Sequence, residues 1–289
     1  MKKLICTIFS LIIAMSVISA KDYHQETSAA LKKKDLKTAQ TYLKKWEKEK
    51  DKDANYYFNW YYYHIIEASM NPELVELKVY SREFDKMVSK GMKMPSVKSM
   101  KKAISYMDDA IKLFPDNLDL YVYRNIATQH IRELDKVKSS FVEMINRSLE
   151  NNNQWYYEEV SCEDGYEAFK IELLKTLQFM VDTEAEDSDI IYLCEALGEK
   201  YPEESITSYF YGIYHLLRNE FKEAVENFEL AVKREPENYN SVFYLALLYE
   251  NEFKDKKKAI YWNEYAKKSS DPNIKDAATK NLQRLKGGK

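Results

Sequence analysis

Residues 205–236 read SITSYFYGIYHLLRNEFKEAVENFELAVKREP and decide the fold. Glycine and alanine in this stretch are small enough to let two antiparallel helices approach each other closely, and a phenylalanine fills the seam between them. The proline ends the second helix because it cannot donate the next backbone hydrogen bond. The residues in these places, at the spacing of a helix–turn–helix unit of about 34 residues, are Gly212, Ala224, Phe228, Ala231 and Pro236.

This unit resembles a tetratricopeptide repeat. A single repeat cannot bury its own apolar face, so the resemblance implies neighbouring repeats that stack into an all-α fold, a right-handed α-solenoid. It also implies a function, because such solenoids hold a partner along an extended concave surface. The partner implied is a protein or a peptide.

Weaker copies of the same spacing recur on both sides of this unit. A further repeat begins near Tyr239, although Asn263 stands on its second helix where an aromatic residue is usual. Upstream, the spacing of Ala224, Phe228, Ala231 and Pro236 recurs twice. It is matched by Ala103, Met107, Ala110 and Pro115, and more loosely by Ala39, Leu43 and Trp46. We expect about six helix pairs and a final capping helix.

The predicted organisation has six parts. They are a leader (1–20), N-terminal repeat-like helices (21–70), an insertion (71–96), degenerate repeat-like helices (97–202), two repeats (203–272) and a capping helix (273–289). Within the insertion, residues 74–86 alternate apolar and polar side chains, which predicts a short extended segment. A second interruption at 151–164 is rich in aromatic residues, and it is either part of a binding surface or a surface elaboration without a role.

The first twenty residues have the pattern of a secretory signal peptide. Lys2 and Lys3 precede an apolar run over residues 4–17, and Ser19-Ala20 offers a cleavage point. The run is shorter than the roughly 20 residues of a membrane span, so we expect no stable span after its removal. The layout resembles exported bacterial tetratricopeptide-repeat proteins of unassigned function, which implies the periplasm or cell envelope.

The charge of the chain narrows the range of expected partners. The formal net charge is −3, or −5 without Lys2 and Lys3, and the charges are interspersed with no basic stripe. Nucleic acid is therefore not an expected partner.

The chain has three cysteines, and Cys6 lies in the leader. Of the other two, Cys162 falls in a predicted loop and Cys194 lies at the seam of a predicted helix. They can pair in an oxidising compartment or stay unpaired.

No motif for catalysis or cofactor binding is present, so we expect neither an enzyme nor a cofactor. His64, His130 and His215 occupy equivalent places on predicted first helices. They are two or more repeats apart, on the order of 20 Å at the spacing of packed helices, which is too far for a shared metal. We expect each histidine to be partly buried and hydrogen-bonded to its neighbours.

Aromatic residues are the remaining signal, since the chain has 24 tyrosines. Tyrosine offers a large amphipathic surface with few rotatable bonds, which suits a binding face, although most of these rings are expected to pack within repeats. The alternative to a peptide partner is a glycan stacked on tyrosines. The residues that the helical register places on the concave groove are Phe58, Tyr62, Tyr209, Ile213, Phe243 and Leu247.

Overall fold

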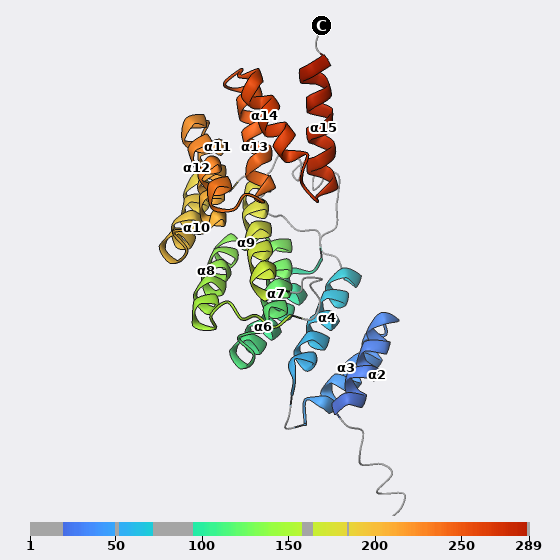
Figure 1. Cartoon of the computed structure of the whole chain (residues 1–289). Helices are drawn as coiled ribbons and strands as arrows, with labels where there is room; N and C mark the ends of the chain where they lie inside the picture. The colour runs from blue at the N-terminus through green and yellow to red at the C-terminus, as the bar shows by residue number, and fades with distance from the viewer. Residues whose placement is uncertain (1–19, 50–51, 72–94, 158–163, 184, 288–289) are drawn as a thin grey trace, which may run out of the picture. The chain divides into compact units, whose positions relative to one another are not determined.

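The computed structural model describes residues 20–49, 52–71, 95–157, 164–183 and 185–287 (Figure 1). Of these residues, 79% lie in thirteen helices and none lies in a strand, which confirms the all-α repeat fold. The extended segment predicted near 74–86 lies outside the described residues. None of the helices within the described ranges has the length and apolar character needed to cross a membrane.

The helices follow one another as six pairs and a cap (Figure 1). The first three pairs are α2 (Ala20–Lys32) with α3 (Leu36–Trp46), α4 (Ala54–Met70) with α6 (Val97–Leu113), and α7 (Leu118–His130) with α8 (Leu134–Glu150). The next three are α9 (Gly165–Asp182) with α10 (Asp187–Lys200), α11 (Ser205–Leu217) with α12 (Phe221–Arg234), and α13 (Tyr239–Asn251) with α14 (Lys256–Ala266). The capping helix is α15 (Pro272–Gly287).

The chain divides into two compact units. The first holds the residues up to Ser140 together with Arg147–Phe169. The second holds Phe141–Asn146 and everything from Lys170 onward. Each unit has its own core, and each is described by itself below.

The seam between α11 and α12 in the second unit is as the sequence predicts. Ala224, Phe228 and Ala231 are fully buried on α12. A Cβ atom added at Gly212 would lie only 2.6 Å from the Phe228 ring, so only glycine permits this approach of the two helices. The close packing of this helical hairpin therefore depends on the absence of a side chain at Gly212.

The last repeat replaces an aromatic contact with hydrogen bonds. Asn263 of α14 is fully buried. Its Nδ2 donates to the Ala259 carbonyl at 2.8 Å, and its Oδ1 accepts from Asn281 Nδ2 of α15 at 3.3 Å. Because a buried amide must be satisfied, the capping helix supplies a partner that an ordinary repeat does not need.

The core of the first unit is built from aromatic rings of α3, α4 and α6. Trp46 is buried edge-on against Tyr56, with ring centroids 5.6 Å apart. Trp60 stacks on Tyr106 at 5.1 Å with the planes 6° from parallel. Most of the tyrosine-rich stretch on α4 thus packs inside the unit, as expected.

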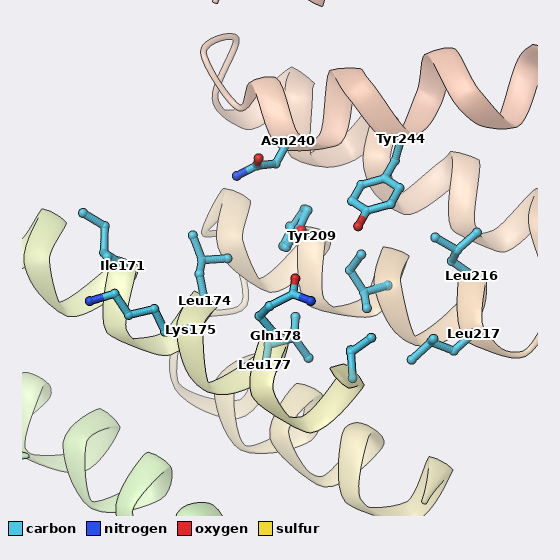
Figure 2. A pocket seen from close by; sticks show the side chains of 12 residues that line it. Ile171, Leu174, Lys175, Leu177, Gln178, Tyr209, Leu216, Leu217, Asn240 and Tyr244 are labelled. Atoms are coloured by element: carbon cyan, nitrogen blue, oxygen red, sulfur yellow. The ribbon is translucent and has the colours of Figure 1, made fainter. Parts of the chain in front are cut away.

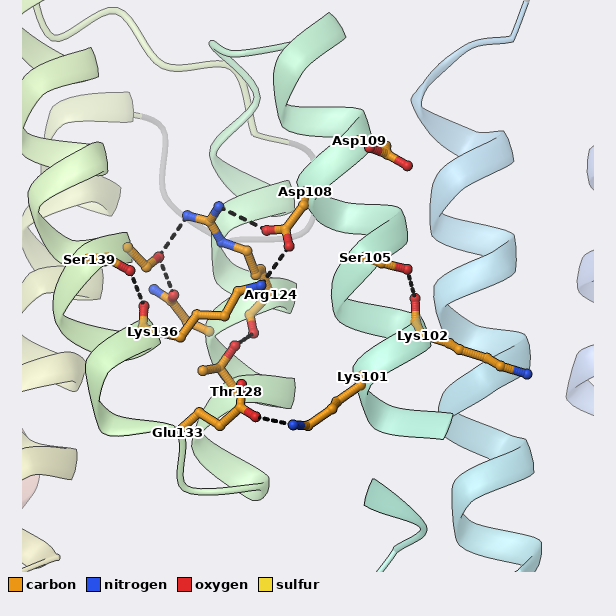
Figure 3. Close-up of polar contacts among 12 residues, drawn as sticks. Lys101, Lys102, Ser105, Asp108, Asp109, Arg124, Thr128, Glu133, Lys136 and Ser139 are labelled. Atoms are coloured by element: carbon orange, nitrogen blue, oxygen red, sulfur yellow. Dashed lines mark hydrogen bonds and ion pairs between the residues drawn. The ribbon is translucent and has the colours of Figure 1, made fainter. Parts of the chain in front are cut away.

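A buried guanidinium ties three helices of the first unit together (Figure 3). Arg124 of α7 is only 5% exposed. It donates to Asp108 Oδ1 of α6 at 3.2 Å and to Ser140 Oγ of α8 at 2.8 Å. Lys136 approaches the second oxygen of Asp108 at 2.6 Å, so the carboxylate is shared by two cations.

The described part of the 151–164 interruption is anchored to the first unit. Trp155 is buried and donates from Nε1 to Ser148 Oγ at 3.0 Å. The Tyr156 backbone N–H donates to the Asp116 carbonyl, and the Leu118 N–H donates to the Tyr156 carbonyl, both at 2.8 Å. These contacts hold the Tyr156 ring at the surface, where it is 53% exposed.

Candidate functional site: a groove between first helices

A groove of about 330 Å³ lies in the second unit between α9, α11 and α13 (Figure 2). These are the first helices of three successive pairs, the elements that the resemblance assigns to the concave face. The residues that line the groove are Ile171, Leu174, Lys175, Leu177, Gln178 and Val181 of α9, Tyr209, Ile213, Leu216 and Leu217 of α11, and Asn240 and Tyr244 of α13. The lining is mainly apolar, with two phenols, two amides and one amine.

Two tyrosines form the centre of the groove. The rings of Tyr209 and Tyr244 lie 6.2 Å apart. Tyr244 stacks on Phe228 at 5.2 Å, with the planes 8° from parallel, and Tyr209 lies 5.9 Å from the same ring. Burial raises the pKa of both phenols above their usual range, so both are neutral at physiological pH. The ring that fills the repeat seam thus also supports the groove.

The polar groups stand at the edges of this apolar surface. Asn240 of α13 and Gln178 of α9 lie on either side of Tyr209 (Figure 2). Gln178 donates to Asp182 Oδ1 at 2.6 Å, which leaves its own carbonyl oxygen as an acceptor. Asn240 is exposed, so its amide offers both a donor and an acceptor. Lys175 lies 3.6 Å from the Glu172 carboxylate.

Two of the residues predicted to face the concave groove, Tyr209 and Ile213, line this groove. Their role in partner binding stays a prediction. On α13 the lining residues are Asn240 and Tyr244, whereas Phe243 and Leu247 are not among them. The groove lies between helices, so its walls come from the facing sides of neighbours and not from equivalent positions on each. A role of Phe243 and Leu247 in partner binding stays a prediction.

None of the residues predicted from the sequence lies on α9, which forms another wall of the groove. Ile171 on α9 and Leu217 on α11 are 39% and 44% exposed, which is a large exposure for apolar side chains on helices. Together they border the groove.

The two predicted residues of the first unit, Phe58 and Tyr62, both pack against the Tyr123 ring, with the Phe58 centroid 5.4 Å from it. Tyr62 packs its ring against Tyr61 and Tyr123 at 5.6 Å each. Phe58 lines a second cavity of about 430 Å³, which we call the linker cleft. Its other lining residues are Asp53, Ala54, Asn55, Leu113, Phe114, Pro115, Asp116, Asn117 and Tyr156.

The three histidines bond their neighbours as expected, but His130 is exposed and not partly buried. The Nδ1 atom of His64 lies 2.9 Å from Glu67 Oε2, that of His215 lies 2.8 Å from Glu220 Oε2, and that of His130 lies 2.7 Å from the Ile126 carbonyl oxygen. No three acidic, histidine or cysteine side chains gather for a metal ion in the part of the chain that the structure describes. Cys194 is buried on α10, and Cys162 lies outside the described residues.

Comparisons with known proteins return structures only, since no protein-family model and no curated protein matches this chain. YrrB, a tetratricopeptide-repeat protein with an unusual peptide-binding site, is 16% identical over 68% of this chain and 89% of its own, with a TM-score of 0.38. A tetratricopeptide-repeat protein from Parabacteroides merdae is 12% identical over 93% of this chain and 92% of its own, with a TM-score of 0.40. Acl4, an assembly chaperone of RpL4, is 13% identical over 93% of this chain and 99% of its own, also at 0.40.

Similarity this low carries no conclusion about a ligand. The chain's own packing is more informative, because the helix pairs, the Gly212–Phe228 contact and the fully buried Ala224 and Ala231 reproduce the repeat geometry. These contacts give the chain the all-helical repeat fold that its resemblance to tetratricopeptide repeats implies.

Proposed function

We propose that this protein is a non-enzymatic scaffold that binds a peptide segment of another protein in the groove between α9, α11 and α13. The observation that carries the proposal is the apolar lining of that groove, which is flanked by the amides of Gln178 and Asn240. We further propose that it acts in the periplasm or cell envelope of a bacterium, on the basis of the leader pattern in residues 1–20.

The groove suits an extended peptide with apolar side chains. Its volume of about 330 Å³ is at the small end of the range for ligand sites, so it holds a few side chains and not a folded domain. Amide side chains can pair with a peptide backbone, while Tyr209 and Tyr244 contact the inserted side chains. None of the twelve lining residues is a histidine, cysteine, serine or carboxylate, which favours binding over catalysis.

A peptide library displayed on phage and selected on the chain from Lys21 tests this function. We expect selected peptides to share apolar positions and to bind at micromolar affinity, measured by fluorescence anisotropy. Replacing the two exposed border residues together, Ile171→Asp with Leu217→Asp, should weaken binding at least about tenfold, because each change places a charge against an apolar ligand.

Leu230→Asp on α12 is the matched control. Leu230 is 37% exposed, close to the exposure of Ile171, but it does not line the groove. Its binding should equal that of the parent. An equal loss in the control and in the double variant, or a selection that yields no peptide at all, contradicts the proposal.

A second candidate function, capture of a glycan, is favoured by the linker cleft of the first unit. There the exposed ring of Tyr156 and the ring of Phe58 accompany the amide of Asn55. Apolar faces with a few placed polar groups are the usual composition of small-ligand sites. An oligosaccharide array tests it: Tyr156→Ala should abolish binding that Tyr192→Ala, an equivalent change at another exposed tyrosine, leaves intact. An array without any binding rejects this candidate.

A further inference from the structure

The C-terminal part of the chain has the opposite charge to the rest. Residues 254–286 contain ten lysines and arginines against four acidic residues, a net charge of +6, whereas the whole chain carries −3. The net charge of the whole chain does not reveal this basic segment. A basic segment in an otherwise acidic protein indicates an anionic partner for that segment alone.

Two of these lysines, Lys257 and Lys268, are exposed near the start of α14 and just after its end, next to one exposed and two half-buried aromatic rings. We define the α14 face as Lys257, Tyr261, Trp262 and Tyr265 of α14 together with Lys268 of the turn that follows it. On a helical projection Lys257 and Tyr261 fall within roughly 40° of each other, and Lys268 lies in the turn after α14. All three side chains are exposed, Tyr261 by 58%. The rings continue along the helix, since Trp262 lies 4.9 Å from Tyr261 and 5.9 Å from Tyr265.

The charge of this face is not cancelled by the protein itself. Glu264, the carboxylate of α14, is paired with Lys286 of α15. Lys268 lies over the Tyr265 ring at 4.9 Å, which leaves its ammonium group open to an anion. Among the described residues, Lys257 has no hydrogen-bond or ion-pair partner. The face therefore presents uncompensated cations next to tryptophan and tyrosine.

We propose that the α14 face docks the protein on an anionic phospholipid surface. Tryptophan and tyrosine favour the headgroup level of a bilayer, where one end of the ring is apolar and the other is wet. Lysines reach the phosphates while their aliphatic stems lie along apolar surface. Neither the groove nor the linker cleft includes a residue of α14. A flat surface therefore suits this face better than a peptide inserted into a groove.

Vesicle flotation with the chain from Lys21, which contains the described helices after Ala20, tests the docking. The probes are vesicles of phosphatidylcholine alone and vesicles in which a third of the lipid is phosphatidylglycerol. We expect binding only to the second kind, weaker as salt rises. Each lysine near an anionic surface contributes about fivefold, so reversing two of them, Lys257→Glu with Lys268→Glu, should reduce binding by at least about 25-fold.

The matched control reverses two exposed lysines of α12, Lys222→Glu with Lys233→Glu, and it changes the net charge by the same amount. Retained binding in this control supports a local surface. Equal loss in both double variants, or equal binding to both kinds of vesicle, overturns the proposal. Tighter binding to poly-glutamate or to single-stranded RNA than to the anionic vesicles, with loss in the α14 variant, also overturns it. Peptide binding in the groove should be unchanged throughout, so the two proposals can fail separately.

Discussion

Replacing Gly212 with alanine inserts a methyl group into the close contact between α11 and α12. The new Cβ would lie 2.6 Å from two atoms of the Phe228 ring and 3.0 Å from a third. Carbon atoms in contact are normally about 3.5–4.0 Å apart, so the ring must move by about 1 Å. The Phe228 ring is fully buried and stacks on Tyr244 at 5.2 Å, so there is little space into which it can move.

Two opposing effects decide the size of the change. Alanine favours a helix interior over glycine by about 1 kcal/mol. Overpacking a well-packed contact costs about 1–3 kcal/mol, and we expect the upper part of that range because the ring is backed by two tyrosines. The variant should therefore lose about 1–2 kcal/mol of unfolding free energy.

Gly198→Ala on α10 is the control for this prediction. A Cβ there would lie 3.1 Å from the Tyr211 hydroxyl oxygen, the far end of a side chain that can adjust. We expect a neutral to slightly stabilising effect of up to about 1 kcal/mol. Urea unfolding followed by circular dichroism measures both, and the two variants should differ by about 2 kcal/mol.

A compensating variant makes the test stricter. With Phe228→Leu already present, the added methyl group at Gly212 has more room, so the same substitution should cost less than it does in the parent. Equal stability of Gly212→Ala and Gly198→Ala, or strict additivity with Phe228→Leu, would refute the close contact between α11 and α12.

Three further outcomes are expected. Arg124→Met should destabilise the first unit by about 1–3 kcal/mol in urea unfolding, because Asp108 keeps only Lys136 and the buried guanidinium bonds are lost; no change would contradict the network. Desolvation holds the pKa of His64 below its ordinary 6.5, so the unfolded chain protonates first and stability falls as the pH drops below 6.5; His64→Gln should flatten that fall. Burial raises the pKa of the Cys194 thiol to about 12, so in a Cys162→Ser variant of the chain from Lys21, which lacks Cys6, an alkylating reagent should react only after unfolding.

The repeat seam could be predicted because it is local and periodic. Residues 205–236 place small residues and one phenylalanine at positions fixed by helical geometry, and a hairpin of two adjacent helices has few other ways to bury them. The same reasoning located second helices at Ala103 and Ala39, where the structure shows fully buried alanines.

The composition of the groove was decided by tertiary structure. Tyr244 and Gln178 are 66 residues apart, and they border one groove only because α9 and α13 both lie beside α11. A repeat register compares equivalent positions, whereas a groove between helices joins the facing sides of neighbours, so Tyr244 lines it and Phe243 does not. Trp155 and Asn263 show the same limit, since the loop anchor and the amide pair with Asn281 depend on partners that local sequence does not specify.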